Sequence, residues 1–135
     1  MQRKLNRVLL VDDDDDANHI QERLIKKHGF AENIDKVWNG VEALEYLNRC
    51  VTQHDPLPEI IFLDLNMPKM DGWAFLEKYS QLGVEVKRKI ELIILTSSIN
   101  PDDAERASRN PEVKGYKNKF LDKHQLEEIL KLMPT

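Results

Sequence analysis

The stretch LLVDDDDDANHI, residues 9–20, runs from an apolar segment through five consecutive aspartates into a segment of helical period. The apolar segment, 8–11, has no polar residue at either alternate position, which is typical of a strand buried on both faces of a parallel sheet. Four further strands are expected, two equally apolar ones at 60–63 and 92–95 and two more polar ones at 34–38 and 113–116. The two more polar strands are expected at the edges of the sheet, and the three apolar strands are expected in its interior.

Helical segments alternate with these strands. The first helix is expected to bury Ala17, Ile20, Leu24 and His28 before Gly29 ends it, the second to bury Leu44, Leu47 and Val51, and the last to bury Leu126, Ile129, Leu130 and Met133. The expected N-caps of the three middle helices are Asn39, Asp71 and Asn100, the last followed by Pro101. Five strand–helix pairs predict an α/β fold with a five-stranded parallel sheet in the order 2-1-3-4-5 and helices on both faces. This is the doubly wound, flavodoxin-like architecture.

Size and composition narrow the classes of function. The chain has 135 residues, and we expect residues 1–135 to form one domain. No segment approaches the length of a membrane span, and a net charge of −4 argues against nucleic-acid binding. Cys50 is the only cysteine, so an internal disulfide is excluded, a reducing cytoplasm is expected, and Cys50 is expected to pack as a small apolar residue. The basic run 87–89 is expected in a solvated loop.

Polar side chains stand where the interior strands end. Asp12 and Asp13 follow the first strand, Asp64 follows the third, Thr96 follows the fourth, and Lys119 lies near the end of the fifth. In parallel sheets of this order, sites lie beyond the carboxyl ends of the strands, at the switch between the first and the third. An isolated aspartate such as Asp64 would be assigned to a helix or turn cap, so the prediction of a site depends on the whole group.

The chemistry of this group indicates phosphoryl transfer. Two carboxylates about 4 Å apart repel by roughly 4 kcal/mol at an effective dielectric constant of 20. Such a cluster persists if water reaches it, if one carboxyl group stays protonated, or if a divalent cation binds, and an all-oxygen ligand set favours Mg²⁺ or Mn²⁺ over Zn²⁺. Asp64 would attack phosphorus, the Thr96 hydroxyl would donate a hydrogen bond to a phosphoryl oxygen, and Lys119 would neutralise charge.

Four motifs carry a resemblance to a known family. They are VDD at 11–13, DLNMPKMDG at 64–72, LTSS at 95–98 and GYKNK at 115–119. With them the chain resembles the receiver domain of two-component response regulators, and in form it is closest to stand-alone receivers of the chemotaxis-regulator type. The resemblance covers nearly the whole chain. It implies a cytoplasmic, phosphorylation-activated signalling module that is not an enzyme with an external substrate.

The resemblance implies roles for the acidic residues. Asp64 is the expected phosphoacceptor for a histidine kinase or a phosphotransfer protein. Asp13 and Asp64 are expected to bind Mg²⁺ directly, and Asp12 mainly through water. The backbone carbonyl of Asn66 is expected to complete the ligands that the protein supplies.

A switch is implied in the same way. Thr96 is expected to move toward the phosphoryl group while the ring of Tyr116 turns inward, and Lys119 is expected to pair with the phosphate. Asn66 and Ser98 match positions that tune how long the phosphoryl group lasts. The output would be a downstream protein partner, bound by the face of the fourth helix, the fifth strand and the fifth helix. The chain would be a monomer or a weak phosphorylation-dependent dimer.

The other aspartates of the opening stretch have simpler expected roles. Asp15 and Asp16 are expected to cap the first helix, where negative charge favours the positive end of the helix dipole. Asp14 is expected only to add local negative potential.

Two other functions fit parts of the pattern. A small Mg²⁺-dependent phosphatase with an aspartyl nucleophile would usually carry a second acid two residues after the nucleophile, but Asn66 stands there. A flavin-binding module of the same topology would carry glycine and hydroxyl residues in its first loop, where this chain carries acids. The signalling module is therefore the favoured function.

One position departs from the receiver pattern. Receivers usually follow this lysine with a proline joined by a cis peptide bond, whereas here Phe120 follows Lys119. A cis bond costs about 0.5–1 kcal/mol before proline but about 2.5–4 kcal/mol before other residues. A trans bond is therefore expected, with Lys119 still reaching the acidic residues and the Phe120 ring packed away from water.

Overall fold

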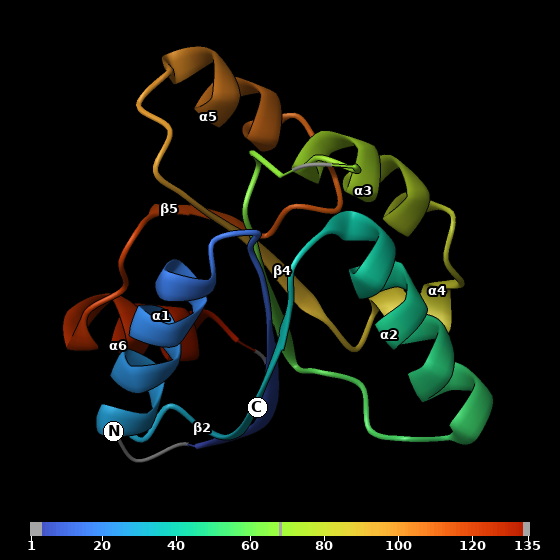
Figure 1. The fold of residues 1–135 in the computed structure, drawn as a ribbon, viewed down its shortest axis with the longest axis horizontal. Helices are drawn as coiled ribbons and strands as arrows, with labels where there is room; N and C mark the ends of the chain where they lie inside the picture. Colours follow the sequence, from blue (N-terminus) through green and yellow to red (C-terminus); the bar gives the residue numbers. More distant parts are fainter. Residues whose placement is uncertain (1–3, 68, 134–135) are drawn as a thin grey trace.

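The computed structural model describes residues 4–67 and 69–133. Five parallel strands form a sheet in the order β2-β1-β3-β4-β5, which confirms the predicted order and the predicted edge strands (Figure 1). The strands are β1 (Leu5–Val11), β2 (Ala31–Val37), β3 (Ile60–Leu63), β4 (Glu91–Thr96) and β5 (Gly115–Asn118). The last strand therefore begins slightly later than the sequence pattern indicated.

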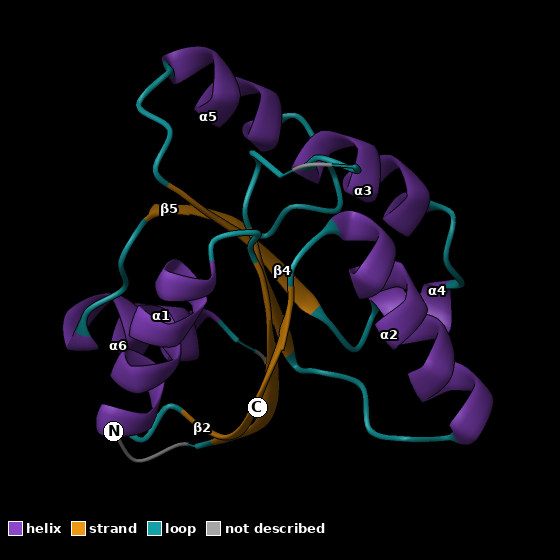
Figure 2. Ribbon diagram, viewed as in Figure 1, coloured by secondary structure: helices purple, strands orange, loops and turns teal. Residues whose placement is uncertain are grey.

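Helices cover both faces of the sheet, as predicted (Figure 2). They are α1 (Asp15–Lys27), α2 (Gly40–Gln53), α3 (Gly72–Ser80), α4 (Val84–Lys87), α5 (Pro101–Ser108) and α6 (Lys123–Leu132). α1 and α6 pack on one face, and α2, α3, α4 and α5 contribute to the core on the other (Figure 1). In the part of the chain that the structure describes, no helix is long and apolar enough to cross a membrane.

Alternate residues of the central strands supply the two cores. On β1, Leu9 and Val11 face the core beneath α2 to α5, while Val8 and Leu10 face the core beneath α1 and α6. Successive side chains point to opposite faces of a strand, so a strand covered on both sides is apolar throughout. Cys50 also packs as expected, because it is buried on α2 with a free thiol whose pKa is raised by burial.

Side-chain caps begin most of the helices. Asn39, Asp71 and Asn100 accept hydrogen bonds from the backbone N–H groups of Glu42, Ala74 and Asp102, which confirms the three predicted N-caps. The prediction for α1 is wrong, because Asp14 is the N-cap and accepts from the N–H groups of Asp16 and Ala17. Asp15 and Asp16 form the acidic first turn instead. Gly29, at φ 64°, follows the end of α1 as predicted.

The buried face of α1 differs from the predicted stripe. Its buried residues are Ala17, Asn18, Gln21 and Ile25. Ile20, which was expected inside, is 44% exposed. A pattern of apolar residues misses this face because two of its inward residues are polar. Asn18 and Gln21 can lie inside because their amides bond to the backbone of Asp12 and Leu121.

Two smaller differences concern α2 and α4. On α2, Val51 is exposed and Cys50 takes the inward position. The short helix α4 was not predicted. It carries Lys87, which was expected in a solvated loop and instead contacts Glu112 and Ser80. Lys87 Nζ lies 3.1 Å from a carboxylate oxygen of Glu112 and donates to the carbonyl of Ser80 at 2.8 Å.

The peptide bond between Lys119 and Phe120 is cis, so the expected trans bond is wrong. The expectation gave the intrinsic preference of the bond more weight than the surrounding loop, whereas tertiary hydrogen bonds hold the residues on both sides. The N–H of Lys119 donates to the carbonyl of Thr96 at 3.0 Å, and the N–H of Leu121 donates to Gln21 Oε1 at 2.9 Å. The Phe120 ring is also less packed than expected, because the residue is 38% exposed.

Candidate functional site

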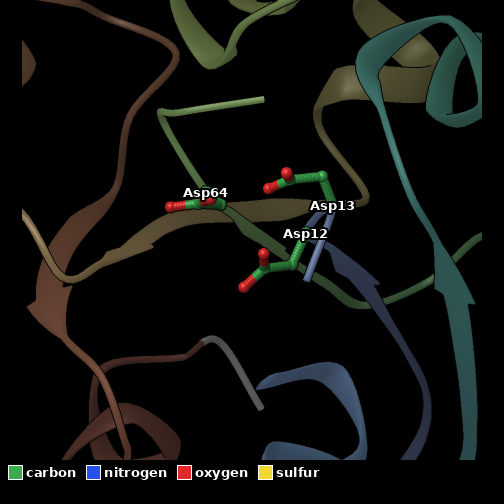
Figure 3. A group of neighbouring side chains, drawn as sticks. All are labelled: Asp12, Asp13 and Asp64. Carbon is green, nitrogen blue, oxygen red and sulfur yellow. The ribbon is translucent and has the colours of Figure 1, made fainter. Parts of the chain in front are cut away.

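β1 and β3 bring three carboxylates together. Val11 pairs with Leu63 in the sheet, so Asp12 and Asp64 directly follow the carboxyl ends of two neighbouring strands. The N–H of Asp64 donates to the carbonyl of Val11 at 2.9 Å, which extends the pairing to the site itself. One carboxylate oxygen from each of Asp12, Asp13 and Asp64 lies within 4.8 Å of the others (Figure 3).

Lys119 reaches this cluster from the loop after β5. Its Nζ atom lies 2.5 Å from Asp12 Oδ2 and 3.6 Å from Asp64 Oδ1. The hydrogen bond from its backbone N–H to Thr96 ties the same loop to the end of β4. The lysine therefore lies at the acidic residues, as expected from the sequence.

Burial and crowding of charge change the acidity of Asp64. Burial raises the pKa of Asp64 to about 6, and the neighbouring carboxylate of Asp12 acts in the same direction. The ammonium group of Lys119 and a hydrogen bond from the Leu65 backbone lower this pKa and so offset part of the rise. Asp64 is therefore a weaker acid than an ordinary aspartate.

The first turn of α1 fixes Asp12. The N–H of Asp14 donates to Asp12 Oδ1 at 3.0 Å, and Asn18 Nδ2 donates to the Asp12 carbonyl at 2.9 Å. Asp13, in contrast, is exposed to solvent. Sequence reasoning missed Asn18, although a polar residue at an inward position of a helix that begins beside the site is a usable signal.

The loop after β3 approaches α3 closely. The N–H of Gly72 donates to the carbonyl of Leu65 at 2.9 Å. A Cβ atom at position 72 would lie 2.6 Å from the Asp64 carbonyl oxygen and 2.8 Å from Leu65 Cα, which are both backbone atoms. Only glycine therefore fits between α3 and the backbone of Asp64. Asn66, which follows in this loop, is exposed.

Thr96 and Tyr116 lie on the same face of the sheet. Ile94 pairs with Tyr116 and Thr96 pairs with Asn118, so Thr96 and Tyr116 project to one side at neighbouring positions of the ladder. Thr96 is fully buried, and its Oγ1 accepts a hydrogen bond from the N–H of Ser98 at 3.1 Å. Among the described residues, the buried hydroxyl of Tyr116 has no hydrogen-bond partner.

Ser98 connects the end of β4 to α5. Its hydroxyl donates to Asp103 Oδ2 at 2.6 Å and accepts from the N–H of Asn100 at 3.2 Å. Asn118 Nδ2 donates to the carbonyl of Ser98 at 3.1 Å. Sequence reasoning identified Ser98 but missed Asp103, because the link depends on how α5 packs.

The donor set fits a hard divalent cation. Three carboxylates face one ammonium group, so the cluster carries excess negative charge when all of its members are ionised. The candidate ligand atoms of Asp12, Asp13 and Asp64 are all oxygens. Mg²⁺ and Mn²⁺ prefer oxygen ligands, whereas zinc sites in proteins are usually built with histidine or cysteine.

Comparison with known proteins decides the family. The family model of the response regulator receiver domain matches residues 8–131. The chain belongs to this family. The match runs from β1 into α6 and includes the whole acidic cluster, Thr96, Tyr116 and Lys119.

Relatives of this receiver include regulatory proteins from two different organisms. The probable methanogenesis regulatory protein FilR2 of Methanothrix harundinacea is 33% identical over 126 residues, which cover 90% of this chain and 79% of FilR2. The response regulator Rcp1 of Synechocystis is 31% identical over 97 residues, which cover 71% of this chain and 65% of Rcp1. The similarity to Rcp1 thus spans slightly less than two thirds of that protein.

Solved receivers share the fold of this chain. A two-component response regulator from Cytophaga hutchinsonii superposes with a TM-score of 0.88 at 32% identity, over 96% of both chains. The Mn²⁺-bound form of Rcp1 superposes with a TM-score of 0.72 at 26% identity, over 94% of this chain and 91% of Rcp1. These similarities confirm the predicted receiver fold.

Proposed function

We propose that this receiver, residues 1–135, is a phosphorylation-activated signalling module that accepts a phosphoryl group on Asp64 from a histidine kinase or a phosphotransfer protein. The observation that carries the proposal is the position of Asp64. Its carboxylate lies 3.6 Å from the Lys119 ammonium group, in a cluster that Asp12 and Asp13 complete. The carboxylate of Asp64, the ammonium group of Lys119 and further carboxylate oxygens that could bind a metal thus lie close together, as phosphoryl transfer requires.

Asp64 supplies the nucleophile. Its pKa of about 6 leaves it ionised at neutral pH. One carboxylate oxygen forms a bond to phosphorus while the P–N bond of a phosphohistidine breaks, and the electron pair of that bond returns to the imidazole nitrogen. Asp64 becomes an acyl phosphate. No proton has to leave Asp64, so the reaction depends on positioning and charge and needs no general base.

The carboxylates are proposed to hold Mg²⁺. Asp13 and Asp64 would bind it directly, Asp12 mainly through water, and Asn66 through its carbonyl. Mg²⁺ would neutralise charge on the phosphoryl oxygens. The chain itself keeps Asp12 in place through the N–H of Asp14. The relative Rcp1, solved in its Mn²⁺-bound form, supports a divalent cation in a receiver of this kind.

Lys119 and Thr96 are proposed to bind the phosphoryl group. The Lys119 ammonium group is close enough to Asp64 to pair with an oxygen of a phosphoryl group bound there. The Thr96 hydroxyl now accepts from the N–H of Ser98, and rotation of the hydroxyl hydrogen would let it donate to a phosphoryl oxygen. Both contacts exist only in the phosphorylated state.

The proposed output is a change in protein binding at the face formed by α5, β5 and α6. The two helices are the fourth and the fifth that the sequence predicts, since the short α4 was not predicted. Phosphorylation can bias this face only through contacts that differ between the two states, chiefly those of Thr96 and Lys119. Movement of Thr96 would be followed by the ring of Tyr116, which lies beside it on the same face of the sheet. A downstream protein in the cytoplasm would read this face, with the receiver as a monomer or a weak phosphorylation-dependent dimer. Catalysis would be limited to its own phosphorylation and dephosphorylation.

Phosphoryl uptake from acetyl phosphate tests the proposal. With Mg²⁺, intact-protein mass spectrometry should show one added phosphoryl group that hydroxylamine removes. Uptake should stop with EDTA and in Asp64→Asn. The matched control is Asp71→Asn, which makes the same substitution in the same loop and keeps a good N-cap for α3. Full uptake in Asp64→Asn would contradict the proposal, and steady turnover of p-nitrophenyl phosphate would favour the phosphatase alternative.

A further inference from the structure

Gln21 is a buried polar residue whose amide contacts the backbone of a single residue far away in the chain. It is 2% exposed on the inward face of α1. The N–H of Leu121 donates to Gln21 Oε1 at 2.9 Å, and Gln21 Nε2 lies 3.5 Å from the Leu121 carbonyl oxygen. Both the oxygen and the nitrogen of the side-chain amide therefore contact the backbone of one residue in the loop between β5 and α6.

Packing alone does not explain a glutamine at this position. A buried amide costs free energy unless it is hydrogen-bonded, and the inward face of α1 packs on an apolar core that includes Ile25 and Leu121. An apolar side chain of similar length would fill this space without that cost. What Gln21 adds is a directed contact with the Leu121 backbone.

This contact fixes the loop that carries Lys119. Leu121 lies two residues after Lys119, and the N–H of Lys119 is itself bonded to the carbonyl of Thr96. The stretch 119–121 is thus held at one end by β4 and at the other by α1. Phe120, between the two ends, is partly exposed and so packs less closely than the fully buried Leu121. Gln21 therefore supplies the directional contact on the α1 side of this loop.

The same helix also holds the partner of Lys119. Asn18 Nδ2 donates to the carbonyl of Asp12 at 2.9 Å, and Asn18 and Gln21 are both on the buried face of α1. α1 is thereby connected to the two segments whose side chains meet in the ion pair of Lys119 and Asp12, 2.5 Å apart. We expect a change in either amide to alter the separation of these segments.

We infer that Gln21 is a positioning residue that aims Lys119 into the phosphoacceptor site by fixing the backbone at Leu121. The inference rests on the proposed function of Asp64 and Lys119, and it assigns to α1 a part in the reaction beyond packing. Gln21 acts through the backbone of the loop and makes no contact with a phosphoryl group.

A kinetic test compares Gln21→Met in two backgrounds. Methionine preserves length and removes both hydrogen bonds. With acetyl phosphate and Mg²⁺, Gln21→Met should slow phosphoryl uptake by about 10- to 100-fold, as expected when a reacting group is displaced. In a Lys119→Met background the same substitution should change the rate by less than about twofold, because the residue that it positions is gone. The control is Gln125→Met, which removes a glutamine contact with Asp122 at the start of α6. It should have little effect in either background.

A second readout does not depend on phosphorylation. Acetylation of lysines by a water-soluble N-hydroxysuccinimide ester, followed by peptide mass spectrometry, reports how well each ammonium group is protected. Lys119 should react several-fold faster in Gln21→Met than in wild type. Lys36 and Lys87, which are ion-paired elsewhere in the fold, should react unchanged and so report that the fold is intact. If wild type takes up no phosphoryl group but this labelling pattern appears, the proposed function fails while the positioning role stands.

Two results would overturn the inference. One is an equal slowing by Gln21→Met with and without Lys119, which would indicate a general structural role. The other is unchanged labelling of Lys119 in a folded Gln21→Met protein. If Gln21→Met does not fold, Gln21→Asn serves instead, because it keeps the amide but is one methylene too short for the contact. The same rates and labelling then decide the question.

Discussion

Lys119 Nζ lies 2.5 Å from Asp12 Oδ2, closer than its 3.6 Å to Asp64 Oδ1. The lysine thus pairs more closely with a carboxylate that is proposed to help bind Mg²⁺ than with the proposed phosphoacceptor. The ammonium group and a bound Mg²⁺ would compete for the same negative charge. Under the proposed function Lys119 would therefore have two opposing effects, since it would weaken the binding of the metal and stabilise the phosphoryl group.

Lys119→Met should separate these effects. We expect Mg²⁺ to bind up to about tenfold more tightly, because a neighbouring positive charge is removed, while phosphoryl uptake slows by about 10- to 100-fold. Isothermal titration with Mg²⁺ and acetyl phosphate kinetics measure the two quantities. Lys36→Met, which breaks an ion pair with Glu22 away from the site, should change neither. Weaker Mg²⁺ binding in Lys119→Met would be inconsistent with competition.

The raised pKa of Asp64 predicts a stability that depends on pH. Because the pKa is about 6 in the folded state and 3.8 ordinarily, the folded state favours the protonated form. The resulting stabilisation is fully present below pH 4 and is lost as pH rises through about 6. After allowance for solvent screening, Asp64→Asn should be more stable than metal-free wild type by about 1–2 kcal/mol at pH 7.5, and by much less at pH 4.

Urea unfolding at the two pH values measures this difference. Addition of Mg²⁺ at pH 7.5 should stabilise wild type more than Asp64→Asn, since the metal offsets the repulsion that the substitution removes. A stability difference that is the same at pH 4 and pH 7.5 would show that Asp64 is not the group responsible.

Gly72→Ala should damage both stability and phosphorylation. Its methyl group would collide with the backbone of Asp64 and Leu65, so α3 or the loop after β3 must move. We expect a loss of about 1–3 kcal/mol in the free energy of unfolding and slower phosphoryl uptake. Gly83→Ala is the matched control, because nothing lies within 4 Å of the added atom. Equal stability of the two variants would contradict the close approach seen at Gly72.

Asp14→Ala tests the corrected start of α1. Loss of an N-cap carboxylate should lower the free energy of unfolding by about 1 kcal/mol, whereas Asp16→Ala should cost less than about 0.5 kcal/mol because only a dipole interaction is lost. Thermal unfolding at neutral pH distinguishes the two substitutions. A larger loss in Asp16→Ala would restore the assignment based on sequence alone.

The sheet and the acidic cluster could be predicted because both depend on local patterns. An apolar run such as 60–63 indicates a strand buried on both faces, and the strand order then places Asp12 beside Asp64 without further information. The caps at Asn39, Asp71 and Asn100 were equally local, since each residue bonds to a backbone N–H two or three positions later.

The residues that the sequence did not reveal depend on distant partners. Gln21 lies on the buried face of α1 because of Leu121, which is 100 residues away. Asn18 lies there because of the Asp12 carbonyl. A pattern of apolar residues placed Ile20 inside instead. The cis bond after Lys119 likewise lies in a loop held by Thr96 and Gln21, which intrinsic preferences do not include.

Borohydride trapping after phosphorylation tests the central claim most directly. Sodium borohydride reduces an aspartyl phosphate to homoserine, whose position peptide sequencing by mass spectrometry can assign. After treatment with acetyl phosphate and Mg²⁺, we predict homoserine at position 64 and at no other aspartate, with none when Mg²⁺ is removed by EDTA. Homoserine at position 12 or 13, or a phosphorylated protein that yields none at position 64, would contradict the assignment of Asp64 as the phosphoacceptor.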